Sequence, residues 1–143
     1  MIRVDPLISQ HLREAGPQAV AAEQQNFQHG WVSETVADPY AAAATGLLAT
    51  QDLRIGTAVS VAFARSPFAV AQSAWELSRA SGGRFVLGLG TQVKAHAERR
   101  FSVEWSPPVA RLRDYVQALR TIWVPSRATG ACGTKASSTS TPC

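Results

Sequence analysis

The segment from Ser81 to Thr91 constrains the fold more than any other, and its sequence is Ser-Gly-Gly-Arg-Phe-Val-Leu-Gly-Leu-Gly-Thr. Gly82 and Gly83 can adopt the positive φ that ends a helix. The apolar run from Phe85 to Leu89 is typical of a strand covered on both faces in a parallel sheet. Glycines at the end of such a strand leave room for a ligand, and parallel α/β folds place their chemistry there. This segment therefore predicts a cofactor-binding edge.

Two other interpretations of the glycines compete with that prediction. Gly-x-Gly at a strand end also occurs in structural turns. The dinucleotide-binding fingerprint needs a third glycine at position 93, where this chain has Val93. The missing glycine argues against a classical Rossmann nucleotide site.

Composition predicts one globular domain. The chain has 143 residues, of which 45% are hydrophobic and 17% charged, so it can bury a core. Its net charge of +4 is scattered, and the densest basic group, Lys94 to Arg100, is too short to argue for nucleic acid binding. No apolar run has the length of a membrane span, and the amino terminus lacks the apolar core of a signal peptide. We therefore expect a cytoplasmic protein with no membrane partner.

The cysteines and histidines predict no metal site. Both cysteines, Cys132 and Cys143, lie near the carboxyl terminus, away from the predicted core. The histidines at positions 11, 29 and 96 show no ligand spacing.

Strands and helices alternate along the first 123 residues. Apolar and β-branched runs predict strands at 2–8, 31–34, 53–61 and 85–89. Helix starts are indicated by Gly16-Pro17, Asp38-Pro39, Ser66-Pro67 and Ser106-Pro107-Pro108. Four βα units predict an α/β fold with a parallel sheet and right-handed crossovers. A doubly wound sheet and half of an eight-stranded barrel fit this pattern equally well.

Several segments together resemble the luciferase-like monooxygenase family, in the branch that uses the deazaflavin coenzyme F420. The most specific is Ser-Gly-Gly-Arg-Phe-x-Leu-Gly-Leu-Gly at 81–90, and further similar segments lie at 31–34, 53–59, 64–67, 91–94, 98–101, 111–113 and 119–123. The resemblance covers residues 1–123. It implies the N-terminal half of a TIM barrel with four βα units, and residues 124–143 would follow it as an irregular tail outside the resemblance.

The resemblance also implies where a cofactor binds. Family members hold a deazaflavin or flavin at the carboxyl mouth of the barrel, near a bulge in the third strand that often contains a non-prolyl cis peptide. By position the bulge falls at Ala58-Val59, and we expect this peptide to be trans in a half-barrel. The implied cofactor-binding residues are Ala58, Val59, Gly90, Thr91 and Gln92.

Glu34, at the end of the second strand, is the implied catalytic residue. It would act as a proton donor or as an orienting hydrogen-bond partner; the alternative is a helix-cap partner at a strand end. Some relatives place an acidic residue after the glycine pair, but this chain has Gln92-Val93-Lys94. Lys94, Arg99 and Arg100 either attract an acidic coenzyme tail or form a solvated helix face.

Three functions remain open from the sequence. The first is hydride transfer between coenzyme F420 and a small organic substrate, and the second is an FMN-dependent monooxygenase reaction. The third is a half-barrel without catalysis, and we expect the chain as it stands to be weakly active or inactive. An exposed half-barrel face also predicts a possible homodimer.

The composition changes after Trp123. Residues 124–143 are rich in Ser, Thr, Gly, Ala and Pro, which predicts a flexible tail. Residues 133–143 can also be back-translated so that a shifted frame encodes Tyr-Glu-Gly-Glu-Phe-Tyr-Gln-His-Thr-Leu, similar to the Gly-Glu-Phe-Tyr found in relatives. The alternative hypothesis is therefore a frameshift near residue 124, which the DNA sequence around that codon tests.

Overall fold

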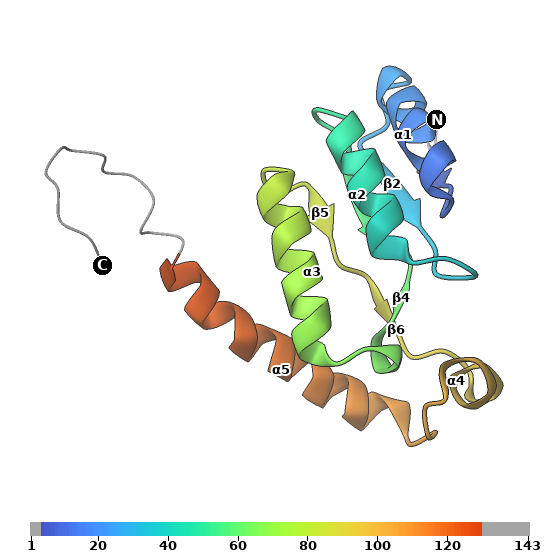
Figure 1. Ribbon diagram of the computed structural model, residues 1–143, viewed down its shortest axis with the longest axis vertical. Helices are drawn as coiled ribbons and strands as arrows, with labels where there is room; N and C mark the ends of the chain where they lie inside the picture. Colours follow the sequence, from blue (N-terminus) through green and yellow to red (C-terminus); the bar gives the residue numbers. More distant parts are fainter. Residues whose placement is uncertain (1–3, 130–143) are drawn as a thin grey trace, which may run out of the picture.

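The computed structural model describes residues 4–129, and Figure 1 shows their arrangement. The elements in chain order are β1 (Leu7–Ile8), α1 (Leu12–Gln24), β2 (His29–Val32), α2 (Pro39–Ala49), β3 (Arg54–Thr57), β4 (Ser60–Val61), the 3₁₀ turn η1 (Ala62–Ala64), α3 (Pro67–Ala80), β5 (Phe85–Val86), β6 (Leu89–Gly90), α4 (Lys94–Phe101) and α5 (Pro108–Thr129). The predictions made for residues 130–143, including the shifted reading frame, lie outside the described residues.

The strands form the predicted parallel sheet. The sheet order is β1-β2-β3-β5, and β4 and β6 form a separate parallel pair. Because neighbours in the sheet follow chain order, right-handed crossovers place every connecting helix on the same side. Figure 1 shows α1, α2 and α3 side by side along that face. One face of the sheet is therefore covered by helices of this chain.

The helix starts of α2 and α3 follow the predicted capping chemistry. The Asp38 carboxylate accepts hydrogen bonds from the N–H groups of Tyr40 and Ala41, at 2.8 and 3.2 Å. The Ser66 hydroxyl accepts from the Ala69 N–H at 3.2 Å. In both helices the next residue is a proline, which has no N–H to leave unpaired.

The first strand and helix differ from the prediction. Strand β1 has only two residues, and α1 begins at Leu12 with Pro17 in its interior, although Gly16-Pro17 was predicted as its start. The N-cap of α1 is His11, whose carbonyl accepts the N–H groups of Glu14 and Ala15, each at 3.0 Å. The Ser9 hydroxyl donates to Glu14 at 2.8 Å and accepts from the His11 N–H at 3.1 Å. The hydrogen bond from Ser9 to Glu14 stabilises a first turn that begins five residues before Pro17.

The third and fourth predicted strands are each interrupted. Strand β3 stops at Thr57 and β4 resumes at Ser60, while β5 stops at Val86 and β6 resumes at Leu89. The interruptions face each other, because the Thr57 hydroxyl donates to the Gly88 carbonyl at 2.7 Å and accepts from the Gly88 N–H at 3.0 Å. A Cβ at Gly88 would lie 2.0 Å from the Thr57 carbonyl oxygen. Gly88 is therefore required by a close backbone approach.

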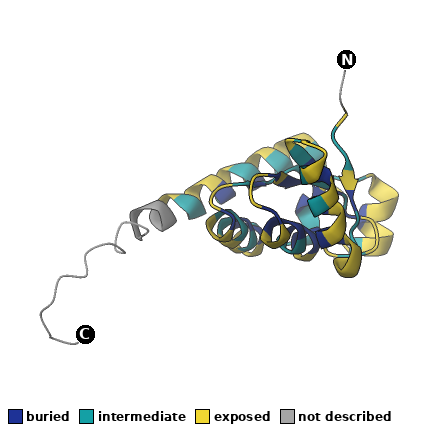
Figure 2. Ribbon diagram, turned by 90° about the horizontal axis from the view of Figure 1, so that it is seen from above, coloured by how far each residue is buried: buried dark blue, intermediate teal, exposed yellow. Residues whose placement is uncertain are grey.

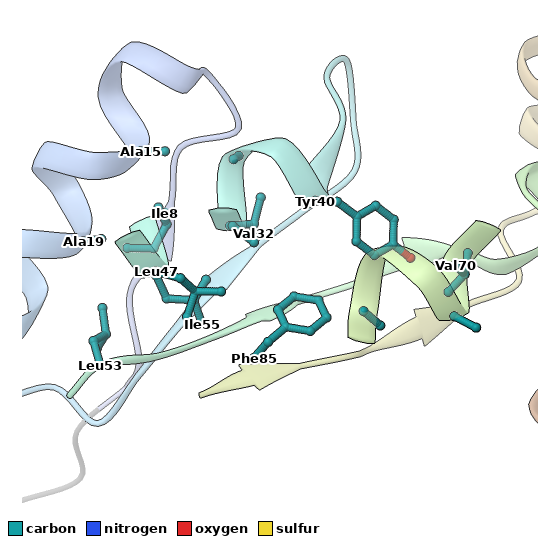
Figure 3. Packing of buried hydrophobic residues seen from close by; sticks show 14 of the residues in the cluster. Ile8, Ala15, Ala19, Val32, Tyr40, Leu47, Leu53, Ile55, Val70 and Phe85 are labelled. Carbon is teal, nitrogen blue, oxygen red and sulfur yellow. The ribbon is translucent and has the colours of Figure 1, made fainter. Parts of the chain in front are cut away.

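The core lies between the sheet and the helices (Figure 3). Val32 and Ile55 point from the strands toward α2 and are fully buried. Ala15 and Ala19 on α1 are also fully buried, and their small side chains let α1 approach α2 closely. Figure 2 shows the buried residues gathered between the sheet and the helices, with the outer helix surfaces exposed.

Helix α5 packs across the end of α3 and then projects beyond it (Figures 1 and 2). It runs to Thr129, whereas the irregular tail was predicted to begin at residue 124. Two side chains dock it: the Tyr115 hydroxyl donates to the Arg65 carbonyl at 3.0 Å, and the Trp123 Nε1–H donates to the Ala71 carbonyl at 3.1 Å. Within residues 4–129, no helix combines the length and apolarity needed to cross a membrane.

Candidate functional site

The predicted site residues come together at the carboxyl ends of the strands. Glu34 follows β2 by two residues, and Ala58-Val59 follow β3 directly. Strand β4, which comes next, pairs with β6 so that Val61 lies opposite Gly90. Thr91 and Gln92 follow Gly90 and are half-buried. The structure therefore gathers all of these residues at one edge, although they come from three βα units.

The Glu34 carboxylate is buried and fully engaged. Its residue is 8% exposed, and both carboxylate oxygens accept from Arg65 Nη1, at 2.8 and 3.0 Å. Oxygen Oε2 also accepts from the Val61 N–H at 2.7 Å and from the Ser60 hydroxyl at 3.5 Å. Glu34 thus contacts the segment after the β3 interruption, and it does not cap a helix.

The bond between Glu34 and Val61 completes one side of β4. Successive N–H groups of a strand point in opposite directions, and the Ser60 N–H donates to the Gly88 carbonyl of the β6 side at 2.9 Å. The Val61 N–H therefore points toward β2, which has already ended at Val32. The Glu34 side chain takes the place of the missing strand partner.

Arg65 joins two carboxylates at this edge. Its Nη2 donates to Asp38 at 3.3 Å, while Nη1 pairs with Glu34, and its guanidinium lies 5.3 Å from the centre of the Tyr40 ring. Burial alone would lower the pKa of the Arg65 guanidinium, but the hydrogen bond and charge of Glu34, with the charge of Asp38, raise it overall. Arg65 is therefore held as a cation.

Tyr40 and Ser60 extend the same network. The Tyr40 hydroxyl and the Ser60 hydroxyl are 2.8 Å apart, and both residues are buried. Burial raises the pKa of Tyr40, which outweighs the opposing effects of the Ser60 hydrogen bond and the Arg65 charge. The network thus links the start of α2 to β4.

The peptide between Ala58 and Val59 is cis, whereas a trans peptide was expected. The expectation rested on the absence of a second half-barrel. The flanking backbone is, however, bonded within this chain: the Ala58 N–H donates to the Val32 carbonyl at 2.7 Å, and Ser60 is bonded to Gly88. Val59 then packs over Gly90, where a Cβ would lie 2.4 Å from Val59 Cγ2.

The polar residues after Gly90 border this edge. Gln92 has a φ of 59°, and its amide oxygen lies 3.3 Å from His96 Nδ1. Lys94 begins the exposed helix α4 and forms an ion pair with Glu98 at 3.9 Å. Among residues 4–129 no group of three or more His, Cys, Asp and Glu side chains is placed to hold a metal ion.

Arg65, Tyr40 and Ser60 were not predicted as site residues. Arg65 lay within a segment carrying the family resemblance, and Ser60 was a polar residue between two valines near the end of an apolar strand. Only the second feature is a local signal for a buried hydrogen bond. Neither feature indicates which carboxylate Arg65 contacts.

Two curated proteins of Mycobacterium tuberculosis match most of this chain in sequence. An uncharacterized protein of Mycobacterium tuberculosis strain H37Rv is 42% identical over 123 residues, which are 86% of this chain and 36% of that protein. Another protein of this strain, provisionally named coenzyme F420-dependent oxidoreductase, is 36% identical over 104 residues, covering 72% of this chain and 30% of that protein. The chain thus spans about a third of the length of these relatives.

Solved structures match the described fold. The oxygenating constituent of 3,6-diketocamphane monooxygenase from Pseudomonas putida, solved in complex with FMN, aligns with a TM-score of 0.73 at 16% identity. The alignment covers 85% of this chain and 40% of the monooxygenase, which identifies the fold as part of a luciferase-like TIM barrel. The family model described as luciferase-like monooxygenase matches residues 2–139. The chain belongs to the luciferase-like monooxygenase family.

Proposed function

We propose that this chain is part of a coenzyme F420-dependent oxidoreductase that transfers hydride between the deazaflavin and a small organic substrate. Residues Ala58, Val59, Gly90, Thr91 and Gln92 would form its ring-binding edge. The observation that carries the proposal is the packing of Val59 over Gly90 at the carboxyl ends of the strands. The relative provisionally named coenzyme F420-dependent oxidoreductase adds support at 36% identity.

The residues present fit a flat, tricyclic ring. Val59 offers an apolar side chain that is 42% exposed. The absence of a side chain at Gly90 leaves the room in which Val59 packs. The Thr91 hydroxyl and the Gln92 amide would meet the polar border of the ring, beside Ala58. When bound, the deazaflavin supplies the hydride chemistry, and the protein contributes position and electrostatics.

FMN is the second candidate cofactor, because its ring has the same shape and would meet the same edge. An FMN-dependent monooxygenase would then be the function. A proton-donor role for Glu34 stays a prediction from the family resemblance. It requires that the Glu34 carboxyl group release its hydrogen bonds from Arg65 and contact the ligand instead.

A titration of the 143-residue chain with F420 and with FMN, followed by fluorescence and by NMR shifts, tests the proposal. We expect F420 to shift the amide NMR signals of Val59, Gly90 and Thr91. The Kd should lie above about 100 μM, because hydrogen bonds that the rest of a full barrel would make to the cofactor are lost at ~1 kcal/mol each. Binding of FMN without F420 would favour the second candidate. Shifts elsewhere on the chain would contradict the site, and micromolar binding with hydride transfer would contradict the expected weak activity.

A further inference from the structure

We propose that Glu34 and Arg65 form a positioning pair that holds the β4 backbone, and with it the ring-binding edge, in place. This inference rests on the proposed function for the meaning of that edge. It makes Arg65 a functional residue in its own right, and it gives Glu34 a task other than proton transfer.

The contacts of Glu34 are those of a structural acceptor. Its carboxylate receives a main-chain N–H at 2.7 Å and a guanidinium at 2.8 Å, and it is 8% exposed. Hydrogen bonds to a charged acceptor are stronger than neutral ones, so this carboxylate is a firm anchor for Val61. A proton donor, in contrast, needs an open path to its ligand.

Arg65 fixes the direction of that anchor. Its planar fork binds Glu34 through Nη1 and Asp38 through Nη2, and Asp38 is itself held by the first turn of α2. A lysine would keep the charge but could not span both carboxylates in this geometry. The position of the Glu34 carboxylate is therefore tied to the helix start.

The hydrogen bond between Glu34 and Val61 is connected to the ring-binding edge through Val61 and Val59. Val61 lies opposite Gly90 in the β4–β6 pair, and Val59, two residues earlier, packs over the same glycine. A shift of the Val61 backbone would therefore move Val59 relative to Gly90. The Glu34–Arg65 pair would therefore position the ring-binding edge through the Val61 backbone and would not itself contact a ligand.

Amide hydrogen exchange in the ligand-free chain tests the pair directly. We expect Glu34→Ala to speed exchange of the Val61 amide by about tenfold or more, because the N–H loses a charge-assisted bond. Glu34→Gln keeps an acceptor oxygen, so its effect should be smaller. Arg65→Lys should fall between the wild type and Glu34→Ala, and it serves where Arg65→Ala fails to fold.

A double-mutant cycle separates a pair from two independent residues. If the two side chains act together, Glu34→Ala with Arg65→Ala should change Val61 exchange little more than either single substitution. The matched control is Glu76→Gln, which disrupts the exposed Glu76–Arg79 pair on α3 and should leave Val61 exchange unchanged. Additive effects, or wild-type exchange of Val61 in Glu34→Ala, would overturn the proposal.

Ligand titrations distinguish this inference from the proposed function. With FMN or F420 as the probe, Arg65→Lys should reduce the Val59 and Gly90 amide shifts as Glu34→Gln does. If Glu34→Gln reduces these shifts while Arg65→Lys leaves them unchanged, the two residues do not act together and the positioning pair is wrong. If the wild type binds neither probe, the proposed function fails, while Val61 exchange still decides whether the pair holds the backbone.

Discussion

Arg84, at the residue scale, shows how one side chain of the glycine-rich segment serves the fold. Its guanidinium donates to the carbonyls of Leu47, Thr50 and Leu53, at 2.8, 3.1 and 2.8 Å. These residues are buried at the end of α2 and just before β3, so their carbonyls would lose their donor in a buried environment. We expect Arg84→Ala to lower the free energy of unfolding by about 2–4 kcal/mol. Urea denaturation measures this, and an unchanged midpoint would contradict it.

Glu23 contacts the same turn between α2 and β3, and we expect it to make the stability of the fold depend on pH. Its carboxylate accepts the N–H groups of Gln51, Asp52 and Leu53, and its pKa lies below the usual 4.5, chiefly through the bond from Asp52. A lowered folded-state pKa adds stability that is present above pH ~4.5 and is lost as the pH falls through the folded-state value. In Glu23→Gln, which has no carboxyl group to protonate, this contribution to the loss of stability at low pH should disappear. Thermal melts of both chains between pH 3 and 7 measure the difference, and parallel curves would contradict the role of Glu23.

At the element scale, the gap between β3 and β4 and the facing gap between β5 and β6 determine how the strands pack. Gly88 lets β6 approach Thr57 so closely that the hydroxyl and the glycine backbone bond reciprocally. We expect Gly88→Ala to cost about 3 kcal/mol or more and to separate β4 from β6, since the added Cβ meets fixed backbone.

Gly82→Ala is the control for this prediction. Gly82 has a φ of +64° but open space around it, so the substitution should cost about 1 kcal/mol from backbone strain alone. Equal losses in the two variants, measured by urea denaturation, would show that the close approach is unimportant.

The uncovered face of the sheet sets the behaviour of the whole molecule. Helices α1 to α3 cover one face, and Leu7 points away from them with 71% of its surface exposed, in register with Trp31, Gly56 and Val86. Exposed apolar sheet faces favour association, so we expect the chain to form dimers that bury this face.

Sedimentation velocity over a concentration series checks the dimer. Leu7→Glu should weaken association at least about tenfold, because it places a charge in the buried face. Leu48→Glu changes an equally exposed leucine, at 72%, on the helix side and should leave association unchanged. Equal effects of the two substitutions would contradict the sheet face as the interface.

The sequence by itself determined the order of the four βα units and the starts of α2 and α3. These features depend on neighbours in the chain: an apolar run makes a buried strand, and Asp38 or Ser66 caps the turn that follows it. The place of Glu34 at the carboxyl edge follows in the same way, because parallel strands bring their ends together.

Only the tertiary structure decided what those residues contact. Thr57 meets Gly88 across 31 positions, and Arg65 meets Glu34 across another 31, so no local pattern could indicate either pair. The first contact interrupts two strands that periodicity predicted as continuous, and the second occupies a carboxylate that the sequence left free for chemistry. Both outcomes follow from hydrogen-bond partners that become neighbours only when the sheet has formed.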